Sequence, residues 1–524
     1  MSHARCACAR ALSRAQLGLE APLIQVEAHV GAGLPSFTIV GLPAPVVRES
    51  RERVRAALLS SGFEFPPGRI TVNLAPAELS KQGGRFDLPI ALALLSAMGQ
   101  LPQSPRLTYE CYGELGLAGE LKPVGGLFLT ALHAQAAEHA LIVPSQNADE
   151  LRLSGHPAVY GAANLRAAAR LFASAEPVAE TPPRLAAADS PPQFGGHPPP
   201  SLSEIVGQWH AKRALVIAAA GGHSLLMIGP PGSGKSMLAA RLPELLPPLS
   251  ASEALEVASI ASTAGVKFEA QSWMRRPFRA PHHSASTQAI VGGGPQIRPG
   301  EISLAHHGVL FLDELPEFDR RVLESLREPL ETGAITIARA AARLELPARF
   351  QLIAAMNPCP CGYLGDPAKR CRCGTPRIER YRQRISGPLL DRIDIRVEVP
   401  RMAGMEFTAG AAERREAAAA EAARSVAQVQ QARVWRLQRS GCLSARLNAS
   451  QIQRCCALPR ASRQLLERSA ERLALSGRGI HRLLAVGRTI ADLAGSETIE
   501  PPHLAEAVQL RRDCVGAYCA SDTM

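Results

Sequence analysis

The first 176 residues alternate short segments with strand and helix periodicity. Residues 23–30 alternate apolar and polar side chains, as expected of a half-buried strand, and residues 70–74 read as a second strand. Residues 46–61 carry apolar side chains at helical spacing, and residues 88–98 form an apolar, helix-like run. We therefore predict an α/β domain over residues 1–176.

Residues 201–400 also alternate strands and helices, with short continuous apolar runs typical of buried parallel strands. Before them, residues 177–200 hold eight prolines and few apolar residues, which predicts a stiff, largely unstructured linker. Residues 411–439 predict a partly exposed connecting helix, because their apolar positions are sparse, and residues 446–513 predict a small helical bundle. The chain as a whole is therefore predicted to be a multidomain α/β protein with a helical region at residues 401–524.

One phosphate-binding motif stands directly after the apolar run 225–228. The segment consists of Gly229, Pro230, Pro231, Gly232, Ser233, Gly234, Lys235 and Ser236, and it fits the P-loop pattern G-x-x-x-x-G-K-[ST]. Its glycines allow successive backbone N–H groups to surround a phosphate, and the start of the following helix adds a positive dipole end. We expect Lys235 to reach the β- and γ-phosphates of ATP, and the Ser236 hydroxyl to hold Mg²⁺.

Two further apolar runs end in polar side chains suited to triphosphate hydrolysis. Residues 308–312 are followed by Asp313 and Glu314, and residues 350–356 are followed by Asn357. We expect Asp313 to hold Mg²⁺ and Glu314 to orient and deprotonate the attacking water. Asn357 would hold that water or the γ-phosphate; the alternative is a turn-forming Asn-Pro pair.

Four cysteines form two tight pairs, each followed by glycine. Cys359 and Cys361 make the first pair, and Cys371 and Cys373 make the second. Four thiolates can close a tetrahedral zinc site, although C-x-C is tighter than the usual C-x-x-C. Reduced free thiols and a redox pair are the two alternatives.

Four histidines occur as two adjacent pairs, His282 with His283 and His306 with His307. A metal site would need a regular spacing of ligands, and no such spacing joins the two pairs. We therefore expect these histidines to cap helices or to lie in the core.

The formal net charge is +11, which is compatible with a polyanionic partner. The basic N-terminal segment lacks the apolar stretch of a signal peptide, and the longest uncharged run contains the P-loop. These features predict a protein of the reducing cytoplasm without a membrane-spanning segment.

Arg392 precedes a fourth apolar run, residues 393–399. An Arg at this place could act as a finger on the γ-phosphate of a neighbouring subunit; the alternative is a surface ion pair with Asp391 or Asp394. P-loop, Asp-Glu strand, Asn strand and Arg in this order resemble an AAA+ ATPase. Residues 279–294 and 298–306 resemble, more narrowly, the ComM/YifB family of magnesium-chelatase-like ATPases. The resemblance extends over nearly the whole chain.

This resemblance implies that Arg478 is the second sensor of a helical lid, with Arg482 as the alternative. It also implies a ring helicase that uses ATP and Mg²⁺, assembles as a hexamer, and promotes branch migration of DNA during natural transformation. Its DNA would be single-stranded, forked or branched. Residues 331–346 resemble the channel hairpin of the minichromosome maintenance helicases, in which Arg339 and Arg343 would face phosphates. An exposed hairpin with solvated arginines is the alternative.

The N-terminal region resembles the proteolytic domain of Lon and the corresponding domain of RadA. The similarity lies in residues 81–92 and 119–127. Arg85 stands where Lon has its nucleophilic Ser, and Thr130 stands where Lon has its Lys. A Ser nucleophile needs an adjacent base, so we predict no peptidase activity. The domain would instead assemble the ring or hold DNA.

Three functions are compatible with an ATPase of this kind: a DNA motor, an ATPase that remodels a protein partner as a magnesium-chelatase motor does, and an ATP-dependent protease. The missing Ser–Lys pair counts against the protease. The basic hairpin and the whole-chain resemblance favour the DNA motor over the chelatase-like ATPase.

Overall fold

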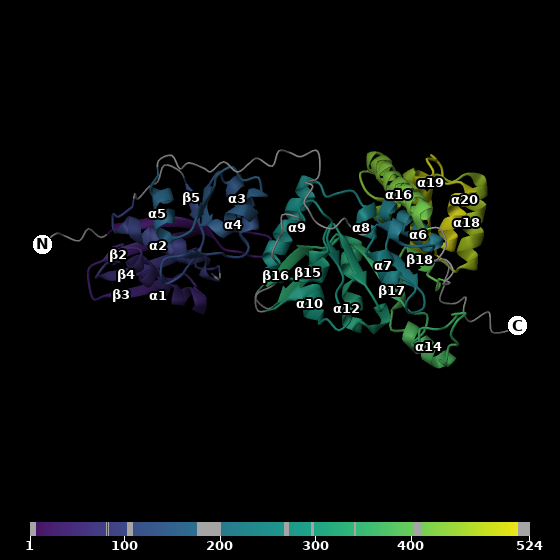
Figure 1. Ribbon diagram of the computed structural model, residues 1–524, viewed down its shortest axis with the longest axis horizontal. Coiled ribbons are helices and arrows are strands. Elements are labelled where there is room, and N and C mark those ends of the chain that lie inside the picture. The colour runs from purple at the N-terminus through teal and green to yellow at the C-terminus, as the bar shows by residue number, and fades with distance from the viewer. Residues whose placement is uncertain are drawn as a thin grey trace. The chain divides into compact units, whose positions relative to one another are not determined.

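The computed structural model describes residues 7–79, 81, 83–101, 108–174, 201–266, 272–294, 298–339, 342–402 and 411–511. The described residues divide into two compact units (Figure 1). Unit 1 combines the N-terminal region with the described part of Ala251–Met274, and unit 2 contains the remaining described residues from Ser201 onwards. The predicted linker, residues 177–200, lies outside the described residues.

A mixed β-sheet forms the centre of unit 1. Within the described residues its strands lie in the order β3-β4-β2-β1-β5-β8-β9. The strands are β1 (Ala7–Arg14), β2 (Leu23–Gly31), β3 (Ser36–Val40), β4 (Arg69–Ala75), β5 (Tyr109–Cys111), β8 (Ala140–Pro144) and β9 (Val159–Ala162). A short ribbon pairs β6 (Glu114–Leu115) with β7 (Leu121–Lys122). The helices are α1 (Pro45–Ser60), α2 (Asp87–Ala97), α3 (Leu127–Ala136), α4 (Ser145–Arg152), α5 (Leu165–Ala173) and α9 (Ala251–Ala264). The strands predicted at residues 23–30 and 70–74 and the helices predicted at 46–61 and 88–98 are confirmed.

Helices cover both faces of this sheet, and strand β8 shows why. Ala140 and Ile142 belong to a core that includes α1, α2 and α5, whereas Leu141 and Val143 belong to a second core with α3 and α4. Successive side chains of a strand point to opposite faces, so an uninterrupted apolar strand requires cover on both. Helix α2 is buried along its whole length, which explains why its sequence is apolar all round.

Helix α9 comes from the middle of the region predicted as the ATPase core, yet it belongs to unit 1. Its Ala258 is buried in the second core, and Leu255 packs against that core. Trp273 contacts Phe128 of α3, with 6.2 Å between the ring centroids. The segment is therefore fastened to unit 1 by apolar burial.

A parallel sheet forms the centre of unit 2. Its described strands lie in the order β11-β14-β17-β10-β18, with bounds β10 (Leu225–Ile228), β11 (Phe278–Arg279), β14 (Val309–Leu312), β17 (Gln351–Met356) and β18 (Ile395–Glu398). The surrounding helices are α6 (Trp209–Gly221), α7 (Lys235–Ala239), α8 (Leu242–Leu245), α10 (Thr287–Val291), α11 (Glu301–Leu304), α12 (Arg320–Ser325), α13 (Arg327–Thr332), α14 (Thr375–Arg382) and α15 (Gly387–Leu390). Two ribbons pair β12 (Gly292–Gly293) with β13 (Arg298–Pro299), and β15 (Ala334–Arg339) with β16 (Ala342–Pro347). Every residue of β10, β14 and β17 is buried, which confirms the predicted buried strands.

The C-terminal part of unit 2 is helical, as predicted. It consists of α16 (Ala411–Ser440), α17 (Ala449–Cys455), α18 (Arg460–Arg472), α19 (Gly477–Leu493) and α20 (Pro501–Gln509). Helix α16 buries Val429 but leaves Val434 and Leu437 about half exposed, in agreement with the prediction of a partly exposed helix. Apolar residues of α19 and α20 share one core with the strands of the sheet, so these helices pack directly on the parallel sheet. None of the described helices has the length and hydrophobicity needed to cross a membrane.

Candidate active site

The polar residues predicted to handle a triphosphate meet at one edge of the parallel sheet. Strand β10 pairs in parallel with β17, and β17 pairs in parallel with β14. The carboxyl ends of these strands therefore lie together, and each is followed by one of the candidate groups: Gly229, Asp313 and Asn357. The sheet topology thus assembles the site that the sequence predicted only as separate motifs.

The P-loop turns sharply between β10 and α7. Gly232 and Gly234 have φ angles of +76° and +91°, a region that side chains rarely adopt. The Gln208 side chain holds the loop from outside, because its Nε2 donates to the carbonyl oxygen of Ser233 at 3.2 Å and to that of Pro400 at 2.7 Å. Sequence reasoning missed Gln208, since a lone Gln before a helix carries no motif.

The helix after the P-loop is short. Helix α7 ends at Ala239, and α8 begins at Leu242 with Pro243 in its first turn. Pro lacks the N–H needed inside a continuous helix, which accounts for the break. A helix of five residues has only a small dipole. The ammonium group of Lys235 and the backbone N–H groups therefore supply most of the positive charge at the P-loop.

Lys235 is buried beneath the loop that precedes it. Its Nζ donates to the carbonyl oxygens of Gly229 at 2.8 Å and Pro230 at 2.9 Å, and to Oδ1 of Asn357 at 3.3 Å. Burial lowers the pKa of this amine, and the nearby carboxylates of Asp313 and Glu314 oppose that shift. The ammonium group is therefore held between the P-loop and the Asn strand.

Ser236 and Asp313 form the second contact across this edge. The Ser236 hydroxyl donates to Oδ2 of Asp313 at 2.6 Å. A hydroxyl and a carboxylate are oxygen ligands of the kind that Mg²⁺ prefers, and Mg²⁺ usually keeps several waters beside such protein ligands. The pair therefore fits the predicted magnesium site.

Glu314 is half exposed and has a left-handed backbone, with φ at +53°. Its carboxylate lies 3.3 Å from Nδ1 of His283. A cavity of about 380 Å³ adjoins both residues, and its lining also includes His282, Phe311 and Asp313. Glu314 is thus placed beside an open volume, as a residue that activates water would need to be.

The two histidine pairs differ in their surroundings. His306 is buried, and its Nδ1 accepts a hydrogen bond from the backbone N–H of Arg349 at 2.9 Å, as expected for a core histidine. His282 is exposed and His283 is partly exposed beside Glu314, so the expectation of a cap or core position is wrong for both. No spacing rule could have found this contact, because it joins two strands through their loops.

The predicted arginines lie at the opposite edge of the sheet. Arg392 and Arg478 both contact Oε1 of Glu331, at 2.8 and 3.1 Å. Arg392 is buried and also donates to the carbonyl oxygen of Pro388, whereas the Arg478 side chain is 53% exposed. The predicted alternative for Arg392 named Asp391 or Asp394 as its ion-pair partner, but the observed partner is Glu331.

Arg482 has a structural partner at the same edge. Its Nη1 contacts the buried carboxylate of Asp394, which directly precedes β18. Asp394 also accepts a hydrogen bond from the backbone N–H of Ser224, just before β10. Because both strands begin here, Arg482 lies at the amino ends of the strands, away from the P-loop of its own chain.

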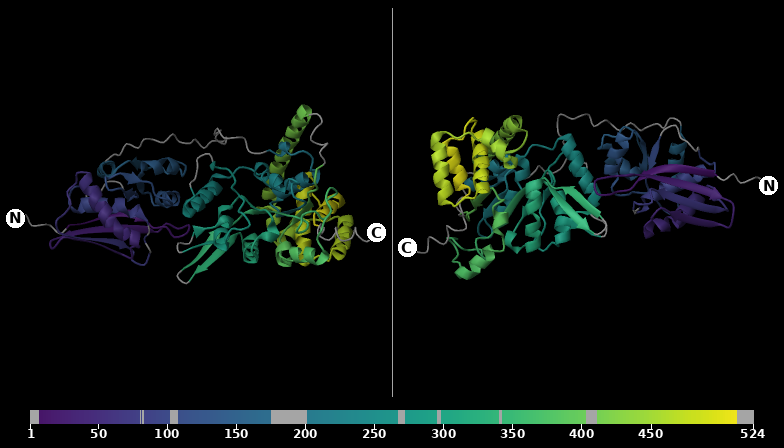
Figure 2. Two further views of the ribbon diagram at one scale, coloured as in Figure 1. Left: turned by 60° about the horizontal axis from the view of Figure 1, so that its bottom comes forward. Right: turned by 180° about the vertical axis from the view of Figure 1, so that it is seen from behind.

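The predicted hairpin is present. Strands β15 and β16 form an antiparallel ribbon (Figure 2). Their register runs from Ala334↔Pro347 to Arg339↔Ala342, and Arg343 pairs with Ala338. Ile335 and Leu346 face each other in the pair and are buried, so the base of the hairpin is anchored in the core. Arg339 and Arg343 stand at its tip, and their side chains lie outside the described part of the structure.

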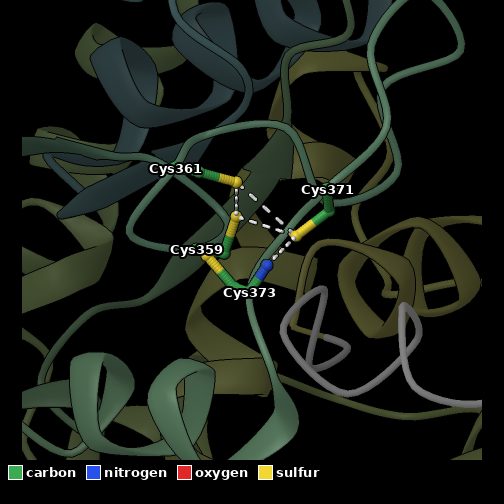
Figure 3. A group of neighbouring side chains, drawn as sticks. All are labelled: Cys359, Cys361, Cys371 and Cys373. Carbon is green, nitrogen blue, oxygen red and sulfur yellow. Dashed lines mark hydrogen bonds between the residues drawn. The ribbon is translucent and has the colours of Figure 1, made fainter.

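Four cysteines converge in the loop between β17 and α14 (Figure 3). The Sγ atoms of Cys359, Cys361 and Cys371 are 3.4 to 3.6 Å apart, and Cys373 completes a set whose sulfur atoms all lie within 4.8 Å of one another. A tetrahedron with metal–sulfur bonds of about 2.3 Å has edges of about 3.8 Å, whereas a disulfide brings two sulfurs to about 2.05 Å. The spacing therefore suits a metal ion rather than disulfides.

The thiols of this cluster differ in their acidity. Burial raises the pKa of Cys359, Cys371 and Cys373. Burial also opposes ionisation of Cys361, but the backbone N–H groups of Tyr363 and Arg372 and the neighbouring thiols lower its pKa to about 6. One thiolate is thus stabilised by the fold itself, and thiolates are the form that binds metals.

In unit 1, the two residues predicted to replace the Ser–Lys pair of Lon, Arg85 and Thr130, each make a structural hydrogen bond. Arg85 is buried, and its Nη2 donates to the carbonyl oxygen of Gly125 at 2.7 Å. The Thr130 hydroxyl donates to the carbonyl oxygen of Gly126 at 3.1 Å. Both side chains therefore brace the turn that begins α3, and neither offers a nucleophile with an adjacent base.

Three parts of the chain match family models of magnesium chelatase. Residues 201–407 match the family model described as magnesium chelatase, subunit ChlI. Residues 26–147 match the model for subunit ChlI of Mg-chelatase, and residues 418–511 match the model for the ChlI C-terminal region.

Individual relatives cover almost the whole chain. The competence protein ComM of Haemophilus influenzae is 46% identical over 95% of this chain and 96% of its own length. A protein named YifB from Escherichia coli is also 46% identical, with the same coverage. The 38 kDa subunit of magnesium chelatase from Cereibacter sphaeroides is 26% identical over 30% of this chain and 52% of that subunit. The chain therefore belongs to the ComM/YifB family of magnesium-chelatase-like AAA+ ATPases.

Proposed function

We propose that this protein is an ATP-driven DNA motor that acts as a ring and promotes branch migration of recombination intermediates, as in the integration of DNA during natural transformation. The observation that carries the ATPase part is the meeting of Lys235, Asp313 and Asn357 at one sheet edge. Similarity to a protein named for competence supports a role on DNA, whether single-stranded, forked or branched. The four-cysteine cluster, which needs reduced thiols, supports a place in the cytoplasm.

Each group at the sheet edge has one task in hydrolysis. The Lys235 ammonium neutralises charge on the β- and γ-phosphates, and Ser236 and Asp313 would hold Mg²⁺, which screens the negative charge that the phosphates carry. Glu314 accepts the proton of the water that attacks the γ-phosphorus, while the bond to the bridging oxygen breaks and ADP leaves with that electron pair. Asn357 orients the water or the γ-phosphate from the adjacent strand.

The positions of the arginines support assembly into a ring. Arg392 and Arg478 lie at the amino ends of the strands, whereas the P-loop lies at the carboxyl ends. Within one chain the two sets of groups are therefore separated by the sheet. A neighbouring subunit can present its arginine edge to the P-loop edge, and repetition of this head-to-tail contact closes a ring, for which we propose six subunits.

Glu331 links these arginines to the hairpin. It belongs to α13, and β15 begins three residues later, at Ala334. An arginine drawn from Glu331 toward a neighbour's phosphate would change the charge balance at the base of the hairpin. In this way hydrolysis could move Arg339 and Arg343 along a DNA strand.

A magnesium-chelatase-like ATPase that remodels a protein partner is the second candidate. The descriptions of the three matching family models favour it, because all of them name the chelatase subunit ChlI. The two functions differ in one measurable respect: DNA should stimulate hydrolysis by a DNA motor, and it should leave hydrolysis by the chelatase-like ATPase unchanged.

The substitution Lys235→Ala tests the nucleotide site. We expect ATP turnover to fall by about a hundredfold or more, because the developing charge on the phosphates loses its buried cation. A steady-state assay of phosphate release measures this, with Lys212→Ala on α6 as a control that removes a lysine elsewhere in unit 2. Undiminished ATP turnover in Lys235→Ala would show that this P-loop is not the site of hydrolysis.

Replacing Arg339 and Arg343 by Ala tests the hairpin. The double variant should bind single-stranded DNA more weakly, and its plot of log K against log salt should lose about 0.7–0.9 in slope per lost phosphate contact. The control replaces two exposed arginines of α18, Arg463 and Arg468, and so removes the same charge. An unchanged slope in the hairpin variant, or an equal loss in the control, excludes these arginines from the DNA path.

We also propose that the four cysteines bind one structural Zn²⁺. Elemental analysis of protein purified under reducing conditions should give about one zinc per chain, and a mercurial that displaces thiolate-bound zinc should release it. Replacing Cys371 and Cys373 by Ser should abolish this zinc. Protein without zinc, whose four thiols all titrate freely, would reject the site.

A further inference from the structure

The four-cysteine loop touches the P-loop directly. Gly362 follows Cys361 with φ at +83°, and a Cβ placed on it would lie 2.6 Å from Cδ and 2.7 Å from Cγ of Pro231. The same point is 3.8 Å from Cγ of Asn357. The backbone of the cysteine loop therefore packs against the P-loop and against Asn357 at once, and only glycine fits this contact.

A second contact joins the same two loops further along. The Asp366 carboxylate is fully buried and lies 3.3 Å from Nε of Arg401. The Nη2 atom of that arginine reaches the carbonyl oxygen of Pro231 at 3.5 Å. Pro231 is thus contacted by Gly362 on its ring and by Arg401 on its carbonyl oxygen, and both contacts depend on where the loop from residue 358 to residue 374 is held.

The loop has little else to hold it. From Pro358 to Gly374 it contains no helix or strand in the described structure, and most of its residues after Leu364 are exposed. Its buried residues are Pro358, Cys359 and Gly362, close to the sulfur cluster, and the Asp366 carboxylate is buried further along. A loop without a hydrophobic core of its own takes a defined shape when a metal ion joins its ends. The two C-x-C pairs stand at the two ends of this loop, ten residues from Cys361 to Cys371.

From these contacts we propose that the cysteine loop is a metal-dependent support of the nucleotide site. Zn²⁺ bound by the four thiolates fixes Gly362 against Pro231. This contact keeps the P-loop, together with Lys235 and Asn357, in the shape that receives a triphosphate. Loss of the metal releases that support and weakens nucleotide binding while the sheet stays folded. This inference rests on the proposed ATPase function and on the zinc site, and it adds a regulatory link between them.

The contact between Gly362 and Pro231 can be broken without touching a cysteine. Gly362→Ala forces a Cβ into Pro231, whereas Gly374→Ala changes the equivalent glycine after the second pair, where the nearest atom to a new Cβ is Cδ of Pro376 at 3.9 Å. Gly374 has φ at −70°, a value that alanine adopts without strain. The two variants therefore share the same chemical change but differ in the contact with the P-loop and in backbone strain, since φ at Gly362 is +83°.

The experiment measures equilibrium binding of a fluorescent ATP analogue with Mg²⁺ present, together with the zinc content and circular dichroism of each protein. Full-length zinc-loaded protein, the same protein after zinc removal under reducing conditions, and zinc-reloaded protein are compared. We expect zinc removal to raise Kd at least about fivefold, a typical size for coupling between two sites, and reloading to restore it. Gly362→Ala should raise Kd similarly, and Gly374→Ala should leave it unchanged.

Pro231→Ala supplies an independent arm, because it removes the ring that Gly362 contacts and leaves the cysteine loop intact. If the support acts through this ring, zinc removal should change Kd less in Pro231→Ala than in the unaltered protein. Equal Kd values with and without zinc, or an undiminished zinc effect in Pro231→Ala, would overturn the proposal. Either result would leave the ATPase function standing, since that function fails only if Lys235→Ala hydrolyses ATP at the normal rate.

Discussion

The parallel pairing of β14, β17 and β10 is the constraint on which the rest of the site depends. Because the three strands run in one direction, the P-loop, the acidic pair and Asn357 must emerge at the same edge. The same geometry sends Arg392 to the opposite edge, where Glu331 holds it. Under the proposed function, a single chain would carry two halves of a hydrolytic site at opposite ends of the strands, as expected of a subunit that works only beside a copy of itself.

Two segments connected to this sheet, the β15–β16 hairpin and the cysteine loop, each start close to a residue of the candidate site. The hairpin β15–β16 follows Glu331 closely, so it adjoins the arginine edge. The cysteine loop follows Asn357 directly and packs against Pro231, so it lies beside the carboxyl ends of the strands, where the P-loop is. The proposed DNA contact and the proposed metal support are thus attached to different halves of the site. Changes in one need not disturb the other within the same chain.

Much of this could be predicted from the sequence, because the motifs are local and their physical roles are tied to the strand or loop that carries them. The buried strands follow from the apolar runs, and the meeting of Ser236 with Asp313 follows from the P-loop motif and the acidic end of strand β14, whereas the prediction of the hairpin rests on a resemblance. Contacts between distant segments could not be predicted. Examples are His283 beside Glu314, Gln208 bonded to the P-loop backbone, and α9 packed in unit 1. These depend on how loops return across the fold, and no periodicity in the chain encodes that.

If triphosphate is cleaved at a site shared by adjacent subunits, two inactive variants with different lesions should restore activity when they are mixed. One variant carries Lys235→Ala, and the other carries Arg392→Ala with Arg478→Ala; both are first shown to be folded by circular dichroism. Each should hydrolyse ATP poorly alone, and the mixture should regain activity, because some interfaces then join an intact P-loop to intact arginines. A mixture no more active than its parts, or full activity of the arginine variant alone, would contradict the account.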